Sequence, residues 1–165
     1  MRRLSLILLV SLLVLPAAAL AARTDKGDGV FELRAANGNF FLTGHGVILG
    51  QMDKGVLRVT DLQPNDPEQP AVSGAEHTRA TDDPNTLVYS GSNIHIRITG
   101  GKYRIRLKGS GIDLTAIGVG IAEVSANPLA FDPGSFSLDG GKWIPVPGDK
   151  FVPYGAQPVG PTTGP

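Results

Sequence analysis

The sequence contains no cysteine and only one tryptophan among its 165 residues. The lack of cysteine excludes disulfide bonds, thiolate metal sites, thiol nucleophiles and attachment of a lipid to an N-terminal cysteine. The fold must therefore depend on buried apolar side chains and on hydrogen bonds. The chain also lacks an Asn-x-Ser/Thr sequon, so no glycan attached to asparagine is expected.

Helical periodicity is missing from the whole chain after its first 22 residues or so. Glycine and proline are abundant instead, with 22 and 13 residues. Short runs that alternate apolar and polar residues recur between glycine-containing turns, about every eight to twelve residues. This pattern predicts an all-β fold, an antiparallel sandwich or flattened barrel of about eight to ten strands behind an N-terminal signal helix.

The N-terminus has the three parts of a secretory signal. Arg2 and Arg3 precede the apolar run Leu4–Leu15, and an Ala-x-Ala cleavage site ends at Ala21. These features predict that residues 1–21 are a signal peptide, although an uncleaved membrane anchor is the alternative. The mature protein is then expected to be secreted or part of the cell envelope, with no transmembrane span after signal cleavage.

Charge and length limit the choice of partner and the number of domains. The mature chain keeps all 15 acidic side chains, whereas two of the 15 basic ones leave with the signal. This slightly acidic balance argues against a general nucleic-acid-binding protein. We expect a single all-β domain over residues 27–147, followed by a disordered Pro/Gly-rich tail over residues 148–165.

The clearest alternation surrounds Gly100-Gly101. Isoleucines occupy positions 94, 96 and 98, and Tyr103, Ile105 and Leu107 follow the glycine pair with the same period. A two-residue turn at these glycines would place Ile98 opposite Tyr103 and bury all six apolar side chains on one face. The same reasoning predicts turns at Asn37-Gly38, Gly91-Ser92 and Ser110-Gly111, and a last hairpin around residues 139–141 with Trp143 packed as its anchor.

The polar face of this hairpin would be basic. Arg97 would lie opposite Arg104, and no acidic residue occurs between Asp83 and Asp113. Such a stripe predicts binding to an anionic partner, either a cell-wall polymer or lipid head groups. The alternative is an ordinary solvated face, balanced by acids from a neighbouring strand. The candidate ligand-binding residues are His95, Arg97, Arg104, Arg106 and Lys108.

The long connection over residues 63–85 provides a second hypothesis. It contains four prolines and is unusually long for a compact domain, which is typical of a functional or mobile segment. Ser73 lies close to Glu76 and His77 in the sequence, so a secreted hydrolase with a site near this loop is the alternative function. Exposed edge strands suggest a third hypothesis, a self-assembling structural protein.

Catalytic and metal-binding patterns are sparse. The chain has no Gly-x-Ser-x-Gly motif, and its three histidines lack the spacing of a metal site. We therefore expect no cofactor, no metal site and no catalytic residue. These observations favour a non-enzymatic protein.

Three segments resemble those of uncharacterised small exported proteins of high-GC bacteria: residues 101–106, 109–114 and 136–141. The similarity would cover most of the mature chain. Because that group has no assigned function, the resemblance implies no activity and identifies no site residue. The sequence thus predicts an exported, non-enzymatic β protein of the cell envelope or extracellular space that binds an anionic polymer through a basic strand face.

Overall fold

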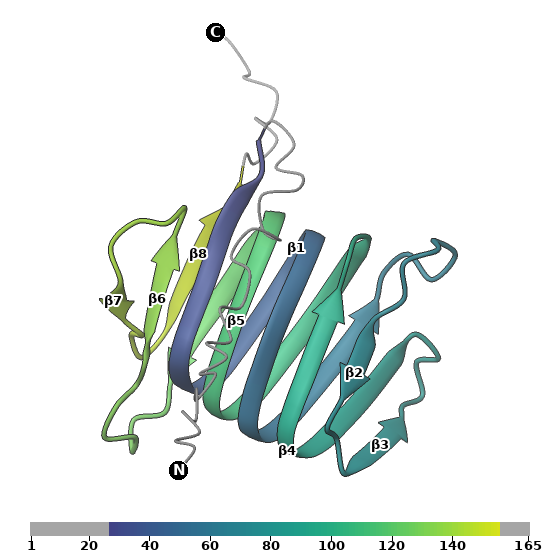
Figure 1. Cartoon of the computed structure of the whole chain (residues 1–165), viewed down its shortest axis with the longest axis horizontal. Coiled ribbons are helices and arrows are strands. Elements are labelled where there is room, and N and C mark those ends of the chain that lie inside the picture. Colours follow the sequence, from purple (N-terminus) through teal and green to yellow (C-terminus); the bar gives the residue numbers. More distant parts are fainter. Residues whose placement is uncertain (1–26, 156–165) are drawn as a thin grey trace, which may run out of the picture.

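The computed structural model describes residues 27–155, and these form one open antiparallel β-sheet without helices (Figure 1). The prediction of an antiparallel all-β protein is confirmed. The expected signal helix at residues 1–21 lies outside the described residues. The eight strands are β1 (Gly29–Asp61), β2 (Ala71–Ser73), β3 (His77–Ala80), β4 (Thr86–Ile98), β5 (Lys102–Ala126), β6 (Ser135–Leu138), β7 (Ile144–Pro145) and β8 (Lys150–Tyr154).

The path through the sheet runs β2-β4-β1-β5-β8. β3 also pairs with β4, and β6 joins β1 to the short strand β7. The connection over residues 63–85, expected to be a long loop, therefore contains two strands that extend the edge of β4.

β1 and β5 contain 33 and 25 residues, far more than the 3–10 or so of an ordinary strand. Both strands bend, so β1 has a segment of β5 on each side. Phe40 of β1, for example, lies between Leu107 and Val124 of β5. Figure 1 shows these strands curving round the lower edge of the molecule, which doubles the sheet over. The first arm contains residues 29–33, 46–51, 94–98 and 112–118, and the second arm contains residues 38–45, 54–61, 86–92, 102–109 and 119–126.

One circuit of β1 around the core takes 17 residues. Phe31 and Ile48, which are 17 positions apart, both lie opposite Ala116. The sequence repeats at the same interval: Gly29-Val30 recurs as Gly46-Val47, Gly38 as Gly55, and Thr43 as Thr60. β1 therefore passes round the core twice, and these residues occupy equivalent positions in the two passes.

Glycines mark the places where the strands change arms. Gly46 faces Gly118, and their φ angles are 138° and 143°. A Cβ on Gly46 would lie 2.1 Å from the carbonyl oxygen of Ile117, and one on Gly118 would lie 2.1 Å from that of His45. Only glycine allows this approach. Hairpin turns were expected at three glycine-containing residue pairs, but the strands continue through all three: Asn37-Gly38, Gly91-Ser92 and Ser110-Gly111.

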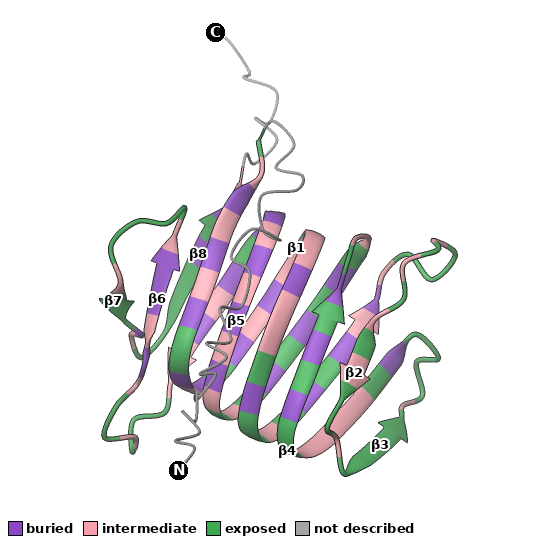
Figure 2. Cartoon of the chain, viewed as in Figure 1, coloured by how far each residue is buried: buried purple, intermediate pink, exposed green. Residues whose placement is uncertain are grey.

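Alternating apolar side chains of both arms form a single core (Figure 2). The six residues predicted to face inward around Gly100-Gly101 are all buried, with exposed fractions of 4% or less. Burial of each large apolar side chain stabilises the fold by about 1.5–3 kcal/mol. At these six positions the alternation therefore predicted correctly which side chains face the core.

The predicted pairing of β4 with β5 is wrong. Ile98 lies opposite Ile48 of β1, and Tyr103 lies opposite Gly44 and Asp61 of the same strand. Gly100-Gly101 connects the end of β4 in the first arm to the start of β5 in the second arm. β1 lies between the two strands, and its apolar residues alternate with the same period, so alternation alone does not distinguish it from β5 as the neighbour of β4.

The C-terminal part is more ordered than expected. The predicted hairpin around residues 139–141 is confirmed by the pairing of β6 with β7. Residues 150–154, expected to belong to a disordered tail, form β8 against β5. Val152 and Tyr154 are buried against the core, which explains why this segment pairs despite its flanking glycines and prolines. Residues 156–165 lie outside the described residues.

Candidate functional site

The five predicted ligand-binding residues do not share one face. Arg97 lies opposite Leu49 in the first arm, whereas Arg104 lies opposite Thr60 in the second arm. The expected juxtaposition of Arg97 with Arg104 is therefore wrong, because β1 separates β4 from β5 in the sheet. Two groups result, each pointing away from the core: His95 with Arg97 on β4, and Arg104, Arg106 and Lys108 on β5.

The group on β5 is longer than predicted. Lys102 joins it, and all four basic side chains are exposed while Tyr103, Ile105 and Leu107 between them are buried. Side chains on one face of a strand are about 6.6–6.8 Å apart, so the four cations span about 20 Å.

Arg58 is a member of this surface that the sequence reasoning missed. It lies directly opposite Arg106 on the neighbouring strand and is exposed to solvent on the same side. No local pattern identifies Arg58, because its position depends on how β1 pairs with β5. We call Arg58, Lys102, Arg104, Arg106 and Lys108 the basic face.

The arginines of the basic face have no carboxylate partners in the part of the chain that the structure describes. Within residues 27–155, none of Arg58, Arg104 and Arg106 forms an ion pair. Directly opposed side chains have Cβ atoms about 4.5–5.5 Å apart, and like charges at this distance destabilise a sheet. The three guanidinium groups therefore keep their donors available for an external anion.

The same three arginines line a hollow of about 420 Å³. The guanidinium carbon of Arg106 lies 5.6 Å from the ring centroid of Phe41, which also lines the hollow. This cation–π contact is worth about 0.5–1 kcal/mol at an exposed site. It orients the guanidinium group and uses none of its N–H donors.

Asp83 is the acidic side chain in the wall of this hollow. Its carboxylate accepts hydrogen bonds from the Thr86 hydroxyl at 2.8 Å and from the Asn85 N–H at 3.0 Å. These two hydrogen bonds, with that of Thr86 the larger influence, hold the pKa of Asp83 below its ordinary value. The Asp83 carboxylate thus stabilises the turn before β4 and forms no ion pair with the arginines.

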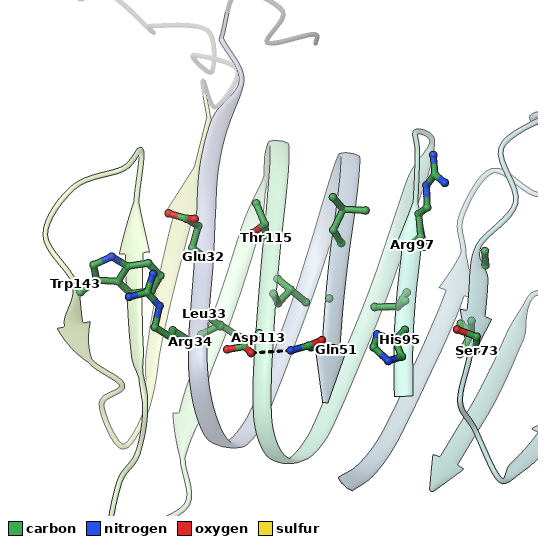
Figure 3. Close-up of a pocket in the computed structure, with 16 residues that line it drawn as sticks. Glu32, Leu33, Arg34, Gln51, Ser73, His95, Arg97, Asp113, Thr115 and Trp143 are labelled. Carbon is green, nitrogen blue, oxygen red and sulfur yellow. Dashed lines mark hydrogen bonds between the residues drawn. The ribbon is translucent and has the colours of Figure 1, made fainter. Parts of the chain in front are cut away.

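The opposite face of the molecule has a larger hollow of about 940 Å³ (Figure 3), which we call the polar groove. Its floor consists of outward-pointing side chains on successive strands of the first arm. Gln51 lies opposite His95 on one side and opposite Asp113 on the other, and Ser73 lies beyond His95. A parallel row contains Arg97, Leu49 and Thr115, with Glu32 opposite Thr115.

Asp113 holds the groove floor together. One carboxylate oxygen accepts the Ala35 N–H at 2.8 Å, and the other accepts the Gln51 amide at 3.0 Å. Ala35 lies in an irregular part of β1 and has a positive φ of 47°. Asp113 therefore supports this strand and positions Gln51.

Trp143 forms one end of the groove rather than the packed anchor that the sequence suggested. It is half-buried, and the guanidinium carbon of Arg34 lies 4.2 Å from its ring centroid. Figure 3 shows this pair at one end of the floor and His95 with Ser73 at the other.

The residues of the hydrolase hypothesis are not assembled into a triad. Ser73 lies opposite His95, whereas His77 lies opposite Ser90. Glu76 accepts hydrogen bonds from the hydroxyl and N–H of Ser92, and these bonds lower its pKa. Among the described residues, no hydrogen bond links Ser73, Glu76 and His77.

Residues 27–155 contain no cluster of three or more histidine, aspartate or glutamate side chains that could hold a metal ion. They also contain no helix of the length and hydropathy needed to cross a membrane.

No protein family, curated protein or solved structure matches the chain. The basic face and the polar groove are therefore the features from which a function can be inferred.

Proposed function

We propose that this chain is an exported, non-enzymatic protein of the cell envelope or extracellular space that binds an anionic polymer through its basic face. The observation that carries the proposal is the direct opposition of Arg58 and Arg106, neither of which forms an ion pair within residues 27–155. The proposal includes cleavage of the signal helix at residues 1–21 and use of the doubled-over sheet as a sandwich-like scaffold.

The energetics of the basic face favour an anionic ligand. Opposed arginines cost the free protein stability, and a bound phosphate or carboxylate converts this repulsion into attraction. Guanidinium groups bind such anions through two parallel N–H bonds, which are stronger than bonds between neutral groups. Thr60 lies opposite Arg104 and supplies a hydroxyl group beside the arginines.

The spacing of the charges favours a polymer over a small ion. Lys102, Arg104, Arg106 and Lys108 recur along β5 at intervals of about 6.6–6.8 Å. A linear chain with a phosphate or carboxylate on each unit can contact several of them at once, so weak single contacts add up to useful affinity. Because all these cations are exposed, their attraction to the polymer should decrease strongly with salt.

Titration calorimetry with linear polyphosphate and with polygalacturonate tests this proposal. We expect binding at low salt that disappears near 1 M salt, where the Debye length is about 3 Å. The double variant Arg58→Thr/Arg106→Thr should lose this binding. The matched control Arg97→Thr, which removes an exposed arginine from the other face, should retain it.

Three results would contradict the proposal. The first is binding of either polymer that is unaffected by salt, and the second is equal loss of binding in the control and the double variant. The third is binding to anionic lipid vesicles but to neither polymer, because the proposed partner is a polymer.

A further inference from the structure

We infer that the polar groove is a second binding site, for an uncharged oligosaccharide. The groove is on the opposite side of the molecule from the basic face, so this inference does not depend on the proposed function. Its evidence is the shape of the groove, its balance of charge, its mixture of hydrogen-bonding groups and the position of Trp143.

The floor of the groove suits an extended ligand. The row from Ser73 through His95, Gln51 and Asp113 to Arg34 crosses five neighbouring strand segments. Adjacent strands are about 4.8 Å apart, so this row is about 19 Å long. An oligomer of several linked sugar rings can lie along it, within the volume of about 940 Å³.

The charges of the groove cancel. Arg34 and Arg97 are balanced by Glu32 and Asp113, all four of which line the groove. A polyanion therefore gains no net attraction here, in contrast to the basic face. Donors and acceptors are interspersed along both rows, which complements hydroxyl groups, because each hydroxyl both donates and accepts hydrogen bonds.

Backbone recognition of a peptide is disfavoured at this site. Extended peptides usually bind by adding a strand to an open sheet edge, where backbone groups are unpaired. From Arg34 to His95 the groove floor consists of strands paired on both sides, such as the segment of β5 between the two passes of β1, whereas β2 at the Ser73 end is a sheet edge. A ligand along this part of the floor must therefore be recognised by side chains.

Trp143 supplies the apolar contact that such a ligand needs. Sugar rings have a flat C–H face that packs against an aromatic ring, while their hydroxyl groups point outward. Arg34 contacts the Trp143 ring and thereby restricts its orientation. Figure 3 shows Asp113, Gln51 and His95 in a row that leads away from Trp143, so further sugar units could follow a unit at Trp143 along this row.

Trp143 is the only tryptophan of the chain, so intrinsic fluorescence reports directly on the groove. The purified protein is titrated with two uncharged oligosaccharides, cellohexaose and hexa-N-acetylchitohexaose, and with polygalacturonate. We expect at least one uncharged oligomer to change the emission saturably and to protect Trp143 from acrylamide quenching. This response should persist at high salt, and polygalacturonate should not reproduce it.

Two single variants in the floor test where the oligomer binds. His95→Leu and Thr115→Val remove polar groups that form no hydrogen bond or ion pair within residues 27–155, so the fold should tolerate them. Each should weaken the fluorescence-detected affinity by about tenfold, the effect of losing roughly 1.4 kcal/mol of hydrogen bonding. The control Arg106→Thr on the basic face should leave this affinity unchanged.

Several outcomes would overturn the inference. These are no response to either uncharged oligomer at millimolar concentration, an equal response to polygalacturonate, or unchanged affinity in both floor variants. The proposed function would survive each of them, because polyphosphate binding to the basic face is measured independently with Arg58→Thr/Arg106→Thr.

Discussion

Arg58 of β1 lies directly opposite Arg106 of β5, and neither side chain forms an ion pair within residues 27–155. The two residues are 48 positions apart in the sequence, so the repulsion arises only when the sheet assembles. Sheets usually place opposite charges or polar residues at such positions. The pair therefore costs the free protein stability, and an anion bound between the two guanidinium groups would relieve this cost.

Replacement of Arg58 should make the protein more stable while it weakens polymer binding. Arg58→Thr removes the repulsion and introduces a residue that favours strands, so the free energy of unfolding should rise by about 0.2–1 kcal/mol at low salt. The gain should shrink at 1 M salt, because screening already weakens the repulsion there. Urea denaturation at both salt concentrations measures this difference.

The matched control is Arg97→Thr, because Arg97 is an exposed strand arginine opposite Leu49. It should give no comparable salt-dependent gain. A loss of stability in Arg58→Thr at low salt would contradict our account of the opposed pair.

The order of strands can be tested by engineered cysteines, since the native chain has none. Opposed residues in antiparallel strands have Cα atoms about 4.5 or 5.5 Å apart, within the range that a disulfide bridges. Leu49→Cys with Arg97→Cys should therefore form an intramolecular disulfide on mild oxidation, whereas Arg97→Cys with Arg104→Cys should not. Mass spectrometry of non-reduced peptides identifies the bond. The reverse result would restore the hairpin that the sequence suggested.

The sequence predicts which side chains point toward the core, but it does not predict which strands are neighbours in the sheet. Ile94, Ile96 and Ile98 point inward because a strand has a period of two, whichever strand lies beside it. Their partner could not be inferred locally, since β1 has the same alternation as β5. The 17-residue recurrence of Gly-Val in β1 was the signal for a strand that passes the core twice.

The candidate site was predictable to the same extent. Arg104, Arg106 and Lys108 share one strand, so alternation alone places them on one face. His95 and Arg97 share another strand, and their separation from β5 depends on where β1 inserts. To place Arg58 on the basic face, the register between β1 and β5 must be known. The polar groove combines side chains from several strands, so only the assembled sheet reveals it.

Gly46 should be among the positions least tolerant of substitution. In Gly46→Ala the new Cβ would need to displace the Ile117 carbonyl oxygen, and φ would remain positive at 138°. Backbone strain alone costs about 1–3 kcal/mol, so the free energy of unfolding should decrease by at least this amount. Urea denaturation provides the measurement.

Gly148→Ala is the control for Gly46→Ala, because nothing lies within 4 Å of a Cβ placed there. Its effect should remain within about 0.5 kcal/mol. Similar stability of the two variants would show that the strands can change arms without the close approach of Gly46 to Gly118.

Alkaline pH should unfold the protein through its buried tyrosines. Burial raises the pKa of Tyr154 to about 12, whereas a tyrosine in the unfolded chain ionises near pH 10. Below pH 10 the hydroxyl is neutral in both states and the stability is fully retained. Between pH 10 and 12 the unfolded state loses its proton first, so stability falls, by about 2 kcal/mol for Tyr154 at pH 12.

Tyr154→Phe isolates this contribution, because it keeps the buried ring and removes the proton. Urea denaturation from pH 8 to pH 12 should show a shallower loss of stability in Tyr154→Phe than in the native protein. Part of the loss should remain, since burial and the charge of Asp66 also raise the pKa of Tyr103 to about 12. The Tyr103 hydroxyl donates to the Glu68 carbonyl at 2.7 Å, so Tyr103→Phe would lose stability at every pH. Identical pH slopes for Tyr154→Phe and the native chain would mean that the Tyr154 hydroxyl reaches solvent, and that β8 closes the core less tightly than its two buried side chains indicate.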